Sequence, residues 1–93
     1  MGTRARLRQE RLPEKLRAIR DALGVSQTEM LHRLGAQDLI SYTQISRFES
    51  GAREPSLQLI LLYARAANVS TDVLIDDALD LPNKLPAKSK HKA

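Results

Sequence analysis

The chain of 93 residues contains no cysteine and no tryptophan, and its aromatic side chains are only Tyr42, Phe48 and Tyr63. The absence of cysteine excludes disulfide frameworks, thiolate metal sites and cysteine nucleophiles. Because 42% of the residues are apolar and so few of them are aromatic, the core has to be aliphatic. No apolar run approaches the roughly 20 residues that span a bilayer. We therefore expect a cytoplasmic protein that has no membrane partner.

Glycine is also scarce, and the four glycines are too scattered to form a phosphate-binding loop. No serine lies in a Gly-x-Ser-x-Gly motif, and the two histidines, His32 and His91, are isolated from each other. The acidic residues Asp76, Asp77 and Asp80 lack the glycine and glutamate spacing of a calcium loop. These absences predict that the protein is not an enzyme, binds no metal and needs no cofactor.

The net charge of +4 is concentrated at the two ends of the chain. Residues 1–20 carry +5 and residues 84–93 carry +4, whereas residues 21–83 carry −5. The middle of the chain therefore lacks a general basic surface, and the net charge alone does not indicate a nucleic-acid partner. A nucleic-acid-binding function has to be argued from a specific motif.

Glycine, proline and capping residues divide the middle of the chain into predicted helices, with no predicted strand. The predicted helices cover residues 13–23, 26–34, 42–50, 57–67 and a short last segment from residue 70 to 77 or 79. The pattern predicts an all-α domain over residues 11–80. We expect a basic arm at residues 1–10 and a disordered basic tail at residues 81–93.

Two of the predicted helices begin with the sequence pattern of a capping box. In this device a serine hydroxyl bonds the backbone N–H three residues on, and the side chain of that residue reaches back. Ser26 with Glu29 fits the pattern, and so does Ser41 with Gln44.

The predicted helix at 57–67 is so apolar that nearly every residue except Gln58 and Arg65 is suited to burial. We expect some of this apolar surface to stay exposed, with Leu59, Leu62 and Tyr63 as the candidates. Such a patch is typical of a homodimer interface, and it equally fits contact with another protein.

The predicted helices at 26–34 and 42–50 have the lengths and order of a helix-turn-helix, in which the second helix enters the DNA major groove. A helical projection of residues 42–50 places Ile45 and Phe48 on the core side. The opposite face carries hydroxyl groups and one arginine, from residues Tyr42, Thr43, Ser46, Arg47 and Ser50. The residues themselves are compatible with a solvated face and with a face that reads base edges.

The order of the motifs closely resembles the Cro/C1-type (XRE-like) helix-turn-helix family over about residues 13–77. The resemblance rests on Ser26-Gln27, on Ile45-Ser-Arg-Phe-Glu-Ser-Gly51 and on Pro55-Ser-Leu57. It implies a five-helix, lambda-repressor-like domain that binds double-stranded DNA. It further implies a transcription regulator, commonly a repressor, that acts as a homodimer on a palindromic operator.

The resemblance also implies roles for individual residues. The base-reading face corresponds to Tyr42, Thr43, Ser46 and Arg47. Gln27 matches the family's phosphate clamp at a helix N-terminus, and Ser50 and Arg53 belong to the loop that approaches the DNA backbone. The positions of Arg20 and Glu49 match a structural ion pair that holds the second helix of the motif.

Two features depart from the family pattern. The connection between Gly35 and Ile45 is three residues longer than usual, and Leu31 stands where the family has a small alanine. We hypothesise that Leu31 pushes the two helices apart and that Leu39 covers the resulting gap.

Two alternatives stay open. The arginines of the arm, Arg4, Arg6, Arg8 and Arg11, and the lysine tail either follow the DNA backbone or only add solubility. The chain itself is either a DNA-binding regulator or a protein-interaction module of the same fold, such as an antitoxin-type partner. The second reading rests on a C-terminal acidic face formed by Asp72, Asp76, Asp77 and Asp80.

Overall fold

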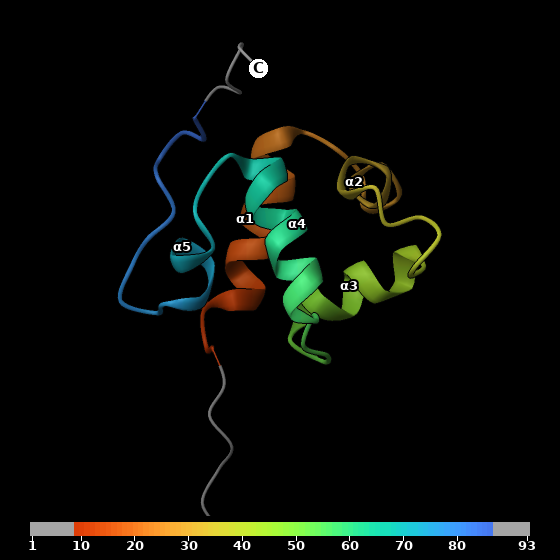
Figure 1. Ribbon diagram of the computed structural model, residues 1–93, viewed down its shortest axis with the longest axis horizontal. Coiled ribbons are helices and arrows are strands. Elements are labelled where there is room, and N and C mark those ends of the chain that lie inside the picture. The colour runs from red at the N-terminus through yellow and green to blue at the C-terminus, as the bar shows by residue number, and fades with distance from the viewer. Residues whose placement is uncertain (1–8, 87–93) are drawn as a thin grey trace, which may run out of the picture.

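A computed structural model describes residues 9–86. This part of the chain folds into helices without a strand, and it confirms the predicted all-α fold class. The helices are α1 (Leu12–Leu23), α2 (Gln27–Leu34), α3 (Tyr42–Ser50), α4 (Leu57–Ala67) and α5 (Thr71–Ile75) (Figure 1). The last helix is shorter than predicted, because the chain turns to extended backbone at Asp76. None of these helices is long and apolar enough to cross a membrane.

The capping box predicted for α2 is present. The Ser26 hydroxyl accepts a hydrogen bond from Glu29 N at 3.0 Å, and Ser26 N donates to Glu29 Oε1 at 2.8 Å. The bond from the Ser26 backbone lowers the pKa of Glu29, as expected for a carboxylate that accepts hydrogen bonds at a helix N-terminus. The start of α2 is therefore fixed by its own sequence.

The second predicted capping box, at the start of α3, is wrong. The Ser41 hydroxyl forms a 2.6 Å hydrogen bond with the Thr43 hydroxyl and makes no side-chain bond to the backbone of α3. The Oε1 atom of Gln44 is buried without a hydrogen-bond partner. Two causes fit this outcome: Thr43 competes for the serine, and the neutral Gln44 amide is less attracted to the helix N-terminus than a carboxylate is.

The core is aliphatic except for Tyr63 and Phe48, as the composition predicts. Its fully buried side chains come from all five helices and include Leu16, Ile19, Met30, Ile45, Tyr63 and Leu74. The expected exposure on α4 is corrected, because Leu59 and Tyr63 are buried. On α4 the exposed leucines are Leu57 and Leu61, which are 82% and 37% exposed, and Leu62 is half-buried against the core. Because they lie four residues apart, Leu57 and Leu61 share one face of α4.

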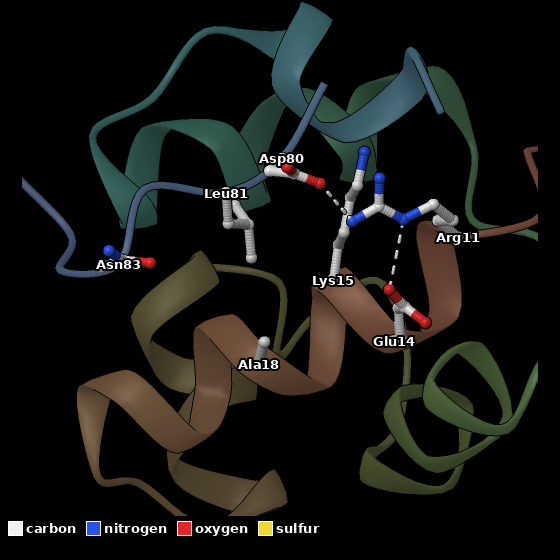
Figure 2. Close-up of a pocket in the computed structure, with 7 residues that line it drawn as sticks. All are labelled: Arg11, Glu14, Lys15, Ala18, Asp80, Leu81 and Asn83. Atoms are coloured by element: carbon white, nitrogen blue, oxygen red, sulfur yellow. Dashed lines mark hydrogen bonds and ion pairs between the residues drawn. The ribbon is translucent and has the colours of Figure 1, made fainter. Parts of the chain in front are cut away.

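The packed part of the chain continues past the boundary predicted at residue 80. Residues 76–85, here called the C-terminal strap, return along α1, and Leu81 and Leu85 pack against the core. Figure 2 shows Arg11 of α1's N-terminal end between Glu14 and Asp80, which it binds at 3.2 Å and 2.6 Å. Arg11 also donates to the carbonyl oxygen of Asp77 at 3.0 Å. Residues 87–93 of the predicted tail lie outside the described residues.

The N-terminal end of α1 and the C-terminal end of α5 meet at the strap. Each of these two ends is capped by a side chain from the other segment. Helix α1 has no side-chain cap of its own, and Asp77 accepts hydrogen bonds from Glu10 N at 2.8 Å and Arg11 N at 3.1 Å. In return, Lys15 Nζ donates to the carbonyl oxygens of Val73 at 2.8 Å and Asp76 at 3.0 Å. Lys15 is only 2% exposed, so its ammonium group has little contact with water. The carbonyl oxygens at the C-terminal end of α5 stabilise its charge instead.

The cap on α1 predicts a pH-dependent stability. The backbone hydrogen bonds from Glu10 and Arg11 lower the pKa of Asp77 in the folded protein. The charged Asp77 carboxylate therefore stabilises the fold fully above its unfolded pKa of about 3.9, and this stabilisation is lost as the pH falls through the lower pKa of the folded state. We expect Asp77→Ala to lower the melting temperature at about pH 7 and to lie closer to wild type at about pH 2.5. Thermal melts followed by circular dichroism measure both values.

Asp38→Ala, at an exposed acid of the α2–α3 connection, is the matched control. It is expected to melt like wild type at neutral pH. An Asp77→Ala defect of equal size at both pH values would contradict the assignment of Asp77 as a charged cap.

Candidate nucleic-acid interface

Helix α3 is attached to the core by one face and exposes the other. Ile45 and Phe48 are buried. The outward face predicted from the helical projection is exposed at every position, namely Tyr42, Thr43, Ser46, Arg47 and Ser50. Arg47 is the single cation among these outward residues, so the face offers hydroxyl groups, one phenol ring and one guanidinium.

The C-terminal end of α3 is held by an ion pair with α1. Arg20 Nε lies 2.7 Å from Glu49 Oε2, and Arg20 Nη2 donates to Glu49 Oε1 at 3.1 Å. The side chains are 15% and 5% exposed, so this is the predicted pair in a two-bond, largely buried geometry. The bond to Glu49 raises the pKa of Arg20. Arg20 also donates to the Val25 carbonyl at 3.0 Å, which links the pair to the residue before the α2 cap.

Gln27, the first residue of α2, joins the same carboxylate. Its Nε2 donates to Glu49 Oε1 at 3.4 Å, and the side chain is half-buried. A primary amide carries two N–H groups and a carbonyl oxygen. One N–H faces Glu49, which leaves the second for a partner outside the protein at the N-terminal end of α2.

The loop after α3 brings the predicted backbone-contacting residues together. Ser50 Oγ donates to the Arg47 carbonyl at 3.1 Å and accepts from Ala52 N at 3.3 Å, which closes the helix end. Arg53 is exposed, and its backbone N–H donates to the same Arg47 carbonyl at 3.3 Å. Gly51 has a φ of 84°, and a Cβ there would lie 3.4 Å from the ring of Pro13, so the turn packs directly against α1.

Gln9, where the described chain begins, lies beside this loop. A shallow pocket is lined by residues of both, including Gln9, Pro13, Arg53 and Pro55. Arg4, Arg6 and Arg8 of the predicted arm lie outside the described residues. Arg11 is bound to the strap and to Glu14.

Comparisons with known proteins identify this arrangement. A family model described as helix-turn-helix matches residues 16–74. The chain belongs to the Cro/C1-type, XRE-like helix-turn-helix family. Its fold is also similar to the crystal structure of the P22 c2 repressor in complex with synthetic operator 9T in the presence of Tl⁺. That similarity has a TM-score of 0.61 and 27% sequence identity, and it covers 71% of this chain and 94% of the repressor chain. A search of curated proteins found no significant match.

Within this helix-turn-helix, the longer connection between α2 and α3 is an ordered turn. Leu39 N and Ile40 N both donate to the Ala36 carbonyl, at 2.9 Å and 3.1 Å. Leu31 is 7% exposed and Ala36 is fully buried, and half-buried Ile40 packs against the core. The hypothesis that Leu39 covers a gap is wrong, because Leu39 is 62% exposed. Ala36 and Ile40 provide the packing that was assigned to Leu39.

Sequence reasoning missed two features of the helix-turn-helix. Neither the exposure of Leu39 nor the hydrogen bond between Ser41 and Thr43 was anticipated. Ile40 stands directly before the Ser41 cap, where an apolar residue packs against the fourth residue of the helix, here Ile45, and this signal favours Ile40 as the inward side chain. The Ser41-x-Thr43 spacing is a usable signal, since two hydroxyls that flank a helix start are able to bond each other.

The ion pair predicts a large effect of removing either partner. Glu49→Ala leaves the Arg20 guanidinium largely buried without its carboxylate, and breaking a buried pair in this way costs about 3–5 kcal/mol when both groups are fully buried. Since Arg20 keeps some solvent contact, we expect a loss at or below the lower end of this range. Urea unfolding gives the free energy directly.

Arg17→Ala is the matched control, because it breaks the exposed pair between Arg17 and Asp21, whose side chains are 65% and 61% exposed. Pairs of this kind contribute about 0–1 kcal/mol. Equal small losses in both variants would show that the Arg20–Glu49 pair does not hold α3.

Proposed function

We propose that the chain is a cytoplasmic, sequence-specific regulator of transcription that represses by occupying an operator in double-stranded DNA. The observation that carries this proposal is the exposed face of α3, which has no acidic side chain and one arginine. The C-terminal end of this helix is fixed by the Arg20–Glu49 pair. The family membership and the likeness to a repressor solved with its operator support it. In this motif the second helix lies in the major groove.

Direct readout of bases is assigned to the outward face of α3. Arg47 is able to donate two hydrogen bonds to the O6 and N7 atoms of guanine, a contact worth about 1–3 kcal/mol of discrimination. Ser46 presents a hydroxyl group that suits either donor or acceptor positions of a base edge, and Thr43 adds a methyl group beside a hydroxyl that is bonded to Ser41. Tyr42 lies at the first position of α3, where recognition helices approach the bases.

Contacts to the DNA backbone are assigned to both sides of this face. Gln27 lies at the N-terminus of α2, where free N–H groups and the helix dipole favour a phosphate. Its link to Glu49 fixes the amide while leaving one N–H for a phosphate oxygen. Ser50 and Arg53 supply the second set of contacts from the loop after α3. Phosphate contacts of this kind position the protein without reading sequence.

The basic arm at residues 1–10 is proposed to add contacts to the DNA backbone. Gln9 lines a pocket together with Arg53 of the loop after α3, and this neighbourhood supports the proposal. Arg4, Arg6 and Arg8 are expected to increase the salt dependence of binding, because each neutralised phosphate releases counterions. Arg11 is left out of this proposal, because it is bonded to Glu14 and Asp80.

A homodimer on a palindromic operator is proposed from the apolar surface that the fold leaves uncovered. Leu57 and Leu61 lie four residues apart on the exposed face of α4, and Ile75 and Leu79 are 38% and 40% exposed beyond α5. A second copy that covers part of this surface would create a two-fold axis. Two recognition helices would then read half-sites about one DNA turn, or 34 Å, apart.

The rival function, a protein-interaction module, loses part of its support. Of the four acids in the C-terminal face, Asp77 and Asp80 are engaged within the chain by α1. Asp72 and Asp76 remain exposed beside Ile75. This smaller surface is the place where an antitoxin-type partner would bind if the DNA experiments fail.

The proposal is tested by selection from random duplex DNA with wild type, with Arg47→Ala and with a control, Arg65→Ala, which removes an exposed arginine of α4. Wild type and the control are expected to select one two-fold symmetric site at about physiological salt. Arg47→Ala is expected to lose the preference for one G·C pair in each half-site.

A selected site without two-fold symmetry would contradict the homodimer. Failure of folded wild-type protein to select any site would contradict DNA readout and direct attention to the surface around Asp72 and Asp76.

A further inference from the structure

The N-terminal half of the recognition element carries no charge. From Leu39 to Ser46 the chain contains no acidic or basic side chain, and Arg47 is the first cation after the turn. Discrimination of guanine by a charged donor is therefore confined to the second turn of α3. The bases that face the start of α3 have to be recognised by hydroxyl groups and apolar surface.

Leu39 provides apolar surface at this end, in a fixed position. The turn that carries it is closed by two backbone hydrogen bonds to the Ala36 carbonyl, at 2.9 Å and 3.1 Å. Its neighbours on either side of the turn, Ala36 and Ile40, pack inward, whereas Leu39 is 62% exposed. The connection runs from α2 around to the N-terminal end of α3 (Figure 1), and Leu39 precedes Tyr42, the first residue of α3, by three positions.

Tyr42 and Thr43 extend this surface onto α3. Tyr42 is 54% exposed, and together with Leu39 it accounts for two of the six large apolar side chains exposed in the described residues. The Thr43 hydroxyl is engaged by Ser41 at 2.6 Å, which leaves its methyl group as the part free for contact. Three neighbouring side chains thus offer carbon surface at the point where a recognition helix enters the groove.

We propose that Leu39, with Tyr42 and Thr43, reads the C5-methyl groups of thymine, so that each operator half-site has thymine opposite the start of α3 and guanine opposite Arg47. The thymine methyl is the one apolar group on a base edge in the major groove, and apolar side chains recognise it by burial. This inference rests on the proposed DNA-binding function and adds the base composition of its target. Burial in such a contact also accounts for an exposed leucine on an ordered turn.

The test replaces thymine by uracil, one position at a time, in the duplex selected by wild type. Uracil removes the methyl group and keeps every hydrogen-bonding atom of the base. Loss of one buried methyl weakens wild-type binding by about fourfold at the thymine next to the start of α3. For Leu39→Ala we expect this ratio of thymine to uracil affinity to fall below the wild-type value, toward one, with Tyr42 and Thr43 still in place.

Two controls separate this contact from general effects. Gln37→Ala removes another exposed side chain of the same connection and is expected to keep the wild-type ratio. Arg47→Ala is expected to bind more weakly and still prefer thymine to uracil at the same position. Because Leu39 is exposed, Leu39→Ala is expected to melt at the wild-type temperature, which excludes unfolding as the cause.

An unchanged thymine preference in Leu39→Ala, or no thymine preference in wild type at any position, overturns the inference and leaves the proposed function standing. Absence of a selected site from folded protein overturns the proposed function and this inference together.

Discussion

The geometry of the helix-turn-helix depends on the carboxylate of Glu49. It is 5% exposed and binds Arg20 of α1 through both oxygens, and one of those oxygens also accepts from Gln27 of α2. Three helices are therefore fixed relative to one another by a single side chain near the end of α3. A desolvated charge tolerates little displacement from its partner, because the lost Coulombic energy is not replaced by water. The orientation of α3 and the orientation of the Gln27 amide consequently depend on the same carboxylate.

Helix α1 organises the opposite side of the molecule by a second set of bonds. Asp77 caps the start of α1, and Lys15 caps the end of α5. Figure 1 shows α5 on the other side of α1 and α4 from α2 and α3. This separation places the strap away from the recognition helix. Within the strap, Asp77 accepts a hydrogen bond from Arg11 N and Asp80 forms an ion pair with the Arg11 guanidinium.

Local signals in the sequence predict most helices well, and contacts between distant residues account for the misses. The Ser26–Glu29 box and the glycines that end α1, α2 and α3 act within a few residues, so their outcome is readable along the chain. The strap depends on bonds between residues 66 and 67 positions apart, such as Arg11 with Asp77 and Glu10 with Asp77, and has no local signature. Helix α4 is apolar on nearly all sides, so periodicity does not distinguish exposed Leu57 from buried Leu59.

The residues of the candidate site also fall into two groups: those that the local sequence predicts, and those that depend on contacts between distant residues. The outward residues of α3 follow from a helical projection, because Ile45 and Phe48 define the buried side. The Arg20–Glu49 pair and the roles of Gln27 and Arg53 came from the family resemblance, since nothing in their spacing indicates that they meet. The inward packing of Ile40 is indicated by its place before the Ser41 cap, whereas the exposure of Leu39 depends on how the turn packs beside Ala36.

The central claim, that the exposed side of α3 is the DNA-binding surface, is tested most directly by chemical-shift mapping of the backbone amides during titration with the selected duplex. The account predicts the largest changes in α3 (Tyr42–Ser50), at Gln27 and in the loop through Arg53, with small changes in α5 and the strap. Changes concentrated in α5 and the strap, with the amides of α3 unaffected, would contradict it.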